Sequence, residues 1–250
     1  MSYRRHRARG LGRLAAGLAL VAHAACADTE RVAYLALVGE APGDKPLYTG
    51  LGAAARFGRP YPQVREPGYR PPALPDASKA GAAGDAAVSA RQALSDRASD
   101  YELRARYLRL NGDEYLGAAA PLRPSVGQPL PPFNQTTQAR LTAARQALAR
   151  IQGDVLSLHG ILQRSEQTKG FAERALAAVR AGGAEAAPLA KPLGDGIAAT
   201  ERMLKDGDAL VGAFVEWMAE QRSALDSLED EIRRGVATGP AILQRESIIQ

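Results

Sequence analysis

Residues 136–179 read TTQARLTAARQALARIQGDVLSLHGILQRSEQTKGFAERALAAV. Apolar side chains recur along this stretch at alternating spacings of three and four residues. The set comprises Leu141, Ala144, Leu148, Ile151, Val155, Leu158 and Leu162, and, after Ser165 and Lys169, Ala172, Leu176 and Val179. Such spacings place the side chains on one face of a helix. The stretch therefore predicts a helix of ~65–70 Å that begins at Thr136 or Thr137 and stops at Gly182-Gly183.

A second apolar stripe follows Pro188 and Pro192. Its members recur every seven residues or stand between such positions: Ile197, Leu204, Val211, Phe214, Met218, Leu225, Leu228 and Ile232. The repeat predicts a matching helix from about Asp195 to Gly235. Two helices of similar length joined by a short Gly/Pro turn must run antiparallel to bury these stripes.

A third helix is predicted upstream, with Asp76 or Ser78 as its cap and Asn111-Gly112 as its end. Its apolar side holds Ala87, Leu94, Ala98, Tyr101, Ala105 and Leu108. Aromatic residues make up only 5% of the chain, which favours thin helices in close contact. The expected fold class is all-α: an antiparallel long-helix hairpin or a three-helix, coiled-coil-like bundle over residues 76–235, followed by a C-terminal tail over residues 236–250.

Three glycines lie inside the central helix, and each costs ~1 kcal/mol relative to alanine. They are Gly153, Gly160 and Gly170. Two interpretations remain open from sequence: the glycines mark close contacts between helices, or they simply weaken this helix.

Proline and glycine dominate residues 42–75, which contain eight prolines. Because proline lacks a backbone donor and interrupts helices, this segment is either an extended linker or an irregular arm laid over another surface. Just upstream, residues 32–38 (VAYLALV) have the length and composition of a short strand. A second irregular, proline-rich stretch is expected over residues 113–134.

The first 25 residues have the layout of a bacterial signal peptide. Five arginines precede an apolar segment of 12 residues, LAAGLALVAHAA, which is too short to span a bilayer of ~30 Å as a helix. Small residues suited to cleavage follow it. The sequence therefore predicts export, with residues 26–75 forming a Pro/Gly-rich arm at the start of the mature chain.

Cys26 is the only cysteine, so the exported chain cannot form an internal disulfide. It follows the apolar segment directly and stands behind Ala24 and Ala25, an arrangement that resembles a bacterial lipobox. His23 departs from that pattern, which places an aliphatic residue there. Cys26 is the candidate lipid-attachment site, and the alternative is an unmodified cysteine that is lost with the signal peptide or remains a free thiol.

The net charge of +5 resides entirely in the predicted signal peptide. Removing its five arginines from the 32 Lys and Arg residues leaves 27, against 27 Asp and Glu residues. A nucleic-acid-binding protein needs a basic surplus to displace counterions from phosphates. Nucleic acid is therefore not an expected partner.

Motifs for catalysis, metals and nucleotides are sparse. His159 is the only histidine beyond residue 25, and the chain contains no G-x-S-x-G or H-E-x-x-H motif. Residues 50–55 (GLGAAA) match the loose dinucleotide fingerprint, but no strand leads directly into them and Pro60 shortens any helix that follows. A carboxylate group at residues 226–231 alternates with arginines four residues away, which predicts ion pairs on a solvated helix face. We expect no catalytic residue, cofactor or metal ion.

These observations favour a non-enzymatic scaffold or adaptor of the bacterial cell envelope, in the periplasm or at the outer membrane. It would present a helical bundle to a protein or cell-wall partner, be anchored through Cys26 if this residue carries lipid, and be able to form an oligomer. One alternative is a periplasmic domain that binds a small ligand between its helices, with Trp217, Phe214 and His159 as pocket walls. Another is a cell-wall enzyme that uses carboxylates.

Overall fold

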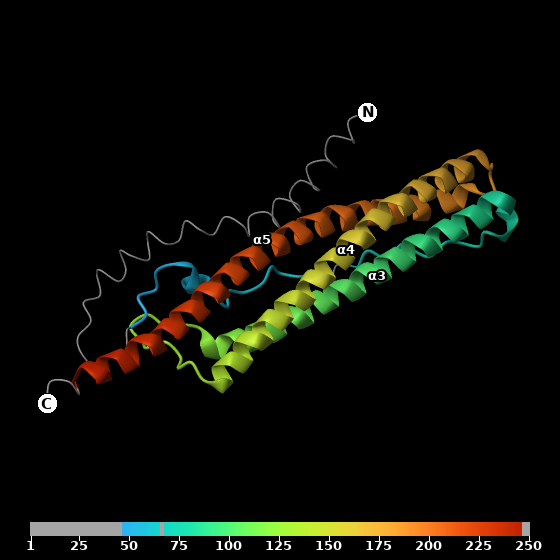
Figure 1. Ribbon diagram of the computed structural model, residues 1–250. Coiled ribbons are helices and arrows are strands. Elements are labelled where there is room, and N and C mark those ends of the chain that lie inside the picture. Colours follow the sequence, from blue (N-terminus) through green and yellow to red (C-terminus); the bar gives the residue numbers. More distant parts are fainter. Residues whose placement is uncertain (1–46, 66–67, 247–250) are drawn as a thin grey trace. The chain divides into compact units, whose positions relative to one another are not determined.

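The computed structural model describes residues 47–65 and 68–246, and from residue 235 onward it describes the helix backbone alone. Three long helices account for most of these ranges (Figure 1): α3 (Gly81–Ala119), α4 (Gln135–Ala181) and α5 (Ala187–Glu246). Short 3-10 helices lie at η2 (Ala53–Arg56), η3 (Ser78–Ala80) and η4 (Ala120–Leu122). The long helices pack against one another, which confirms the predicted all-α, three-helix bundle. The predicted signal peptide, Cys26 and the predicted strand at 32–38 lie outside the described residues.

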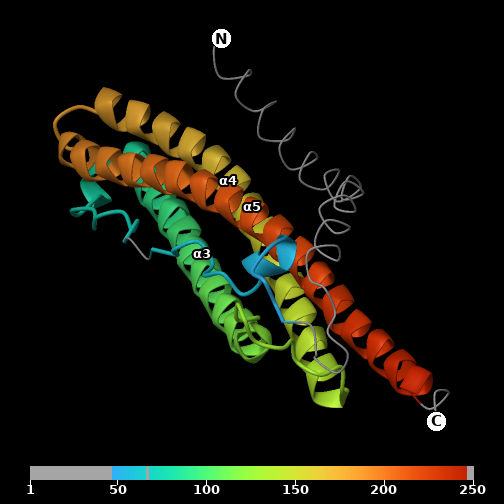
Figure 2. The ribbon, with the colours of Figure 1, turned by 90° about the vertical axis from the view of Figure 1, so that its left-hand side faces the viewer.

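The chain divides into two compact units, and each long helix contributes to both. Unit 1 contains the residues up to Tyr61, Asn111–Arg150 and the residues from Val215 onward. Unit 2 contains Pro62–Leu110 and Ile151–Phe214. In each unit, part of the proline-rich arm lies against the helices (Figure 2).

The core of unit 2 is built from alanine and leucine. It gathers the start of α3, the end of α4 and the start of α5, so α4 runs antiparallel to both of its neighbours here. The buried cluster comprises Ala87, Ala90, Leu94, Ala172, Ala175, Leu176, Val179, Ala186, Leu189, Leu193 and Ile197. All eleven members of the cluster are aliphatic and four of the helix positions in α3 and α4 are alanine, with no aromatic residue among them.

Unit 1 has a more aromatic core, to which the arm contributes directly. Its fully or nearly buried apolar residues are Tyr48, Ala54, Phe57, Tyr115, Ala119, Leu122, Leu141, Ala144, Ala147, Leu148, Trp217, Met218, Ala224, Leu225, Leu228 and Ile232. The first three come from the arm. Over residues 47–61 the proline-rich segment is thus part of the core of this unit and lies over its helices.

The predicted stripes are confirmed. Every apolar residue predicted for the face of α4 is buried, as is every one predicted for α3. On α5 the same holds with one exception, Leu204, which is half-buried. Ser165, which interrupts the α4 stripe, is fully buried. Its hydroxyl donates to the carbonyl oxygen of Ile161 at 2.8 Å, so the polar group is satisfied within the helix.

The predicted ends of α3 were wrong. Asp76 accepts a hydrogen bond from the backbone N–H of Ser78 at 3.0 Å, but this bond closes a local turn just before η3, and α3 begins only at Gly81. At the other end, the helix continues past Asn111-Gly112 to Ala119. Gly112 is buried inside the helix, and a Cβ on it would lie 2.6 Å from the Tyr61 ring. This glycine therefore permits close packing of the arm and does not terminate the helix.

The ends of α4 and α5 also shift. Asn134 caps α4 by accepting from the Thr137 N–H at 2.9 Å, whereas the stop is where we predicted it, with Gly183 at φ 78°. α5 begins at Ala187, well before Asp195. Pro188 stands in its first turn, where a proline sacrifices no intrahelical hydrogen bond, whereas Pro192 lies inside the helix and removes one. It also continues beyond Gly235 to Glu246, so most of the predicted C-terminal tail over residues 236–250 is helical.

The glycines inside α4 do not mark close helix contacts. A Cβ at Gly153 would meet no atom within 4 Å, and at Gly160 and Gly170 it would meet only an arginine side chain of α4 itself. The close approach occurs instead at Gly207 of α5, where a Cβ would lie 2.5 Å from Leu162 Cδ2. No described helix contains a stretch long and apolar enough to cross a membrane.

Candidate functional site: the contacts that hold the arm

The side chain of Gln221 on α5 joins the arm to the helices of unit 1. It is fully buried, and its Oε1 accepts hydrogen bonds from the Gly58 N–H at 2.9 Å and from the Tyr115 hydroxyl at 2.7 Å. Its Nε2 donates to the carbonyl oxygen of Arg56 at 3.0 Å. One amide therefore satisfies two backbone groups of the arm and one side chain of α3.

Aromatic rings surround this amide. Tyr115 packs edge-to-face against Phe57 of the arm, with ring centroids 6.2 Å apart, and against Trp217 of α5 at 5.2 Å. Trp217 also meets Tyr61 of the arm at 6.5 Å, and its Nε1 donates to the carbonyl oxygen of Arg59 at 3.2 Å. Burial raises the pKa of the Tyr115 hydroxyl, so the group stays protonated and donates to Gln221.

Unit 2 fastens its part of the arm in a second way. The Tyr69 hydroxyl donates to Asp206 Oδ2 at 2.7 Å, and the Tyr69 ring packs edge-to-face on Tyr101, with centroids 5.3 Å apart. Burial, together with the hydrogen bond to Asp206, raises the pKa of Tyr69. Further along, Pro71 occupies the space over Gly196: a Cβ added to Gly196 would lie 2.8 Å from the Cβ of Pro71.

Ion pairs connect the helices within each unit. In unit 2, Arg104 Nη1 lies 2.6 Å from Asp154 Oδ1, and Lys169 Nζ lies 3.0 Å from Glu201 Oε1. Asp154 is largely buried, so Arg104 supplies the positive charge that its position requires.

In unit 1 an arginine of one helix forms ion pairs with two carboxylates of another helix. Arg145 of α4 pairs with Asp226 and Glu229 of α5, and Glu229 also pairs with Arg233 at 2.6 Å. Burial alone would raise the pKa of Glu229, but the hydrogen bonds from Arg233 and Arg145 lower it. The i,i+4 ion pair between Glu229 and Arg233 is confirmed, whereas the contacts of Arg145 across helices were not predicted.

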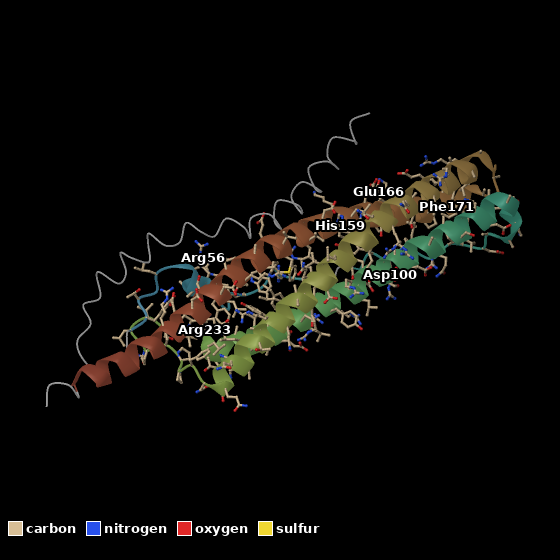
Figure 3. The ribbon with its side chains drawn as sticks, in the orientation of Figure 1. Arg56, Asp100, His159, Glu166, Phe171 and Arg233 are labelled. Carbon is tan, nitrogen blue, oxygen red and sulfur yellow. The ribbon has the colours of Figure 1, made fainter. Side chains whose placement is uncertain are left out.

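Two of the three residues predicted to line a ligand pocket are buried side chains of α5. Trp217 belongs to unit 1 and is packed between Tyr61 and Tyr115. Phe214 belongs to unit 2 and is fully buried. His159 is half-buried on α4, and its Nε2 lies 3.0 Å from Nε2 of Gln163, four residues further along (Figure 3).

The remaining sequence motifs have structural surroundings too. The second half of residues 50–55 belongs to η2, a 3-10 helix of only 4 residues. A dinucleotide fingerprint requires an α-helix at this place. Among the residues that the structure describes, no three His, Cys, Asp or Glu side chains are grouped so that they could hold a metal ion. Cys26, the candidate lipid-attachment site, lies outside the described ranges.

Sequence reasoning missed the residues that hold the arm, notably Gln221, Tyr69 and Asp206. The one available signal was Gln221 itself, a polar residue three positions after the apolar Met218 and four before Leu225, within the predicted core stripe. No protein-family model, curated protein or solved structure matches this chain.

Proposed function

We propose that this chain is a non-enzymatic scaffold or adaptor of the bacterial cell envelope. Its N-terminal segment directs export, Cys26 carries a lipid anchor, and the helical bundle is presented to a protein or cell-wall partner. The proposed location is the periplasm, at the membrane to which the lipid is attached.

The observation that carries this proposal is the use of buried polar groups to fasten the arm. Gln221, Trp217 and Tyr69 each donate or accept a hydrogen bond that joins the arm to a helix. The contacts occur in both units, so the arm is held along its described length. Fastening makes the arm from residue 47 onward part of the bundle, so the folded unit begins closer in sequence to Cys26 than the first long helix does.

The anchor is tested by labelling cells with palmitate and fractionating them, with the wild type beside Cys26→Ala. Lipidation predicts label and membrane association in the wild type and neither in the variant. If both proteins are unlabelled and soluble, the anchor is refuted and the chain is free in the periplasm or secreted.

The scaffold is tested against the ligand-binding alternative by thermal unfolding in a periplasmic extract separated by molecular size. A scaffold gains stability only from the macromolecular fraction, because a partner that binds the folded state stabilises it. Stabilisation by the low-molecular-weight fraction would instead favour a small ligand. The enzyme alternative would require turnover of cell-wall material that is lost when single carboxylates are amidated.

A further inference from the structure

Two neighbouring loops of unit 1 form a surface without any charged residue. They comprise residues 47–55 and 124–134, in a chain of which 24% is charged, and we refer to them as the uncharged loop surface. The Tyr48 N–H donates to the carbonyl oxygen of Gln128 at 2.9 Å, and the Gly127 N–H donates to that of Tyr48 at 2.8 Å. These bonds hold the two loops side by side.

The tips of these loops present apolar side chains to solvent. Val126 is 70% exposed and Leu51 is 66% exposed, the two highest values among the large apolar residues that the structure describes, and Leu47 is 49% exposed. Loop tips in proteins are ordinarily occupied by polar residues and glycine. Here glycines with positive φ flank the apolar residues: Gly50 at 80°, Gly52 at 83° and Gly127 at 76°.

The apolar tips lie next to each other. A Cβ on Gly50 would stand 2.7 Å from Val126 Cγ2, so the tip that carries Leu51 touches the tip that carries Val126. Leu47 continues the same surface through its antiparallel bridge to Pro129. Three exposed aliphatic side chains thus gather on loops that contain no charged residue of their own, with Arg56 and Arg123 at their borders and Arg233 of α5 over the Phe133 ring.

We propose that the uncharged loop surface inserts Leu47, Leu51 and Val126 into the interfacial layer of a lipid bilayer. Transfer of branched aliphatic side chains out of water is favourable. Loops that contain no charged residue can enter the headgroup boundary without the cost of desolvating a charged side chain of their own. A second copy of the chain fits less well, because three side chains cover far less than the ~1,200 Å² that a stable interface buries.

The position of the surface along the chain supports a lipid partner. Leu47 follows Cys26, the proposed lipid-attachment site, by 21 positions in the sequence. The inference therefore rests in part on the proposed function: with lipid on Cys26, the loops are tethered close to a bilayer. A tether raises the local concentration of the loops at the bilayer, so it adds to an insertion that the loops also make without the anchor.

The experiment measures the partitioning of the full exported chain onto vesicles of phosphatidylethanolamine and phosphatidylglycerol by flotation. Cys26→Ala is used throughout so that no acyl chain contributes. The test variant carries Leu51→Asp and Val126→Asp. The control variant carries Leu103→Asp and Leu156→Asp in unit 2, where the exposed fractions are 52% and 54%. All four positions are exposed, and circular dichroism verifies that each variant retains its helices.

We expect the parent chain, Cys26→Ala with unsubstituted loops, to float with the vesicles. The partition coefficient of the test variant should fall at least about tenfold, and that of the control variant should equal the parent's. Absence of flotation by the parent chain, or an equal loss in both variants, would overturn the proposal. So would a test variant that changes only the oligomeric state in sedimentation, because a second copy would then cover the surface. Palmitate labelling separates the two proposals: label without flotation refutes the loop surface alone, and flotation without label refutes the anchor alone.

Discussion

Replacement of Gln221 by alanine removes the amide that joins the arm to α3 and α5. In the native protein, this side chain is fully buried and makes hydrogen bonds to Gly58, Tyr115 and Arg56. Alanine makes none of them. The Gly58 N–H, the Tyr115 hydroxyl and the Arg56 carbonyl group would each lose their bond to the amide in a part of the core that excludes water.

The magnitude follows from these three bonds. A buried hydrogen bond contributes about 1 kcal/mol net, and a buried partner left unsatisfied costs about 1–3 kcal/mol. Rearrangement of the exposed part of the arm would let water reach some of these groups. We therefore expect Gln221→Ala to lower the free energy of unfolding by about 3–5 kcal/mol.

The assay follows urea unfolding through the fluorescence of Trp217, the only tryptophan. Trp217 lies in unit 1 and donates to the Arg59 carbonyl, so its emission reports on release of the arm. Trypsin provides a second measurement, because Arg56 has a side chain that is 60% exposed and is followed by Phe57. Cleavage after Arg56 should accelerate in the variant if the arm leaves the helices more often.

The control is Gln163→Ala, which removes an exposed glutamine from α4 and should change stability by less than about 0.5 kcal/mol. A double-mutant cycle with Tyr115→Phe adds a stricter test, because the two side chains share one hydrogen bond and their effects should not add. Equal stability of the two glutamine variants, or unchanged trypsin cleavage in Gln221→Ala, would refute the role assigned to this amide.

Gly207→Ala should destabilise the protein by about 1–3 kcal/mol because its Cβ would overlap a neighbouring leucine, whereas Gly153→Ala should stabilise it by about 0.5–1 kcal/mol. Changes in melting temperature of the same sign in differential scanning calorimetry would contradict this. Leu158→Asp places an unpaired charge in the core and should cost at least about 3 kcal/mol, whereas Arg164→Asp on the exposed side should cost little; equal melting temperatures would refute the helix register. Glu229 has a pKa below its ordinary value of 4.5, so its ion pairs stabilise the fold above that pH and this contribution is lost as the pH falls further. Glu229→Gln should therefore lower the urea midpoint at neutral pH, with a difference from the wild type that narrows below about pH 4.5, and a pH-independent difference would contradict the assignment.

The helical part of the fold was readable from the sequence because it depends on local periodicity. Burial on one face of a helix requires apolar residues every three or four positions, and α4 follows this spacing from Leu141 to Val179. The same periodicity on α5, with a Gly/Pro turn between the two helices, was sufficient to predict an antiparallel bundle.

The candidate site was largely hidden from sequence because its contacts join residues far apart in the chain. Gly58 and Gln221 are 163 positions apart, and Tyr69 and Asp206 are 137 positions apart. No local pattern links such pairs. Exposed polar side chains ordinarily satisfy their hydrogen bonds with water, so a glutamine or tyrosine shows its structural role only once its surroundings are known.

What the sequence determined by itself is the all-α class, the buried face of each helix and the turn at Gly182-Gly183, because these follow from helix geometry and backbone preference. Only the tertiary structure decided where α3 and α5 end and where the arm lies. Gly112 shows the physical reason: its sequence context predicts a helix end, yet the Tyr61 ring occupies the space where a side chain would be. A glycine ends a helix or admits a neighbour according to what packs against it, and that neighbour comes from a distant part of the chain.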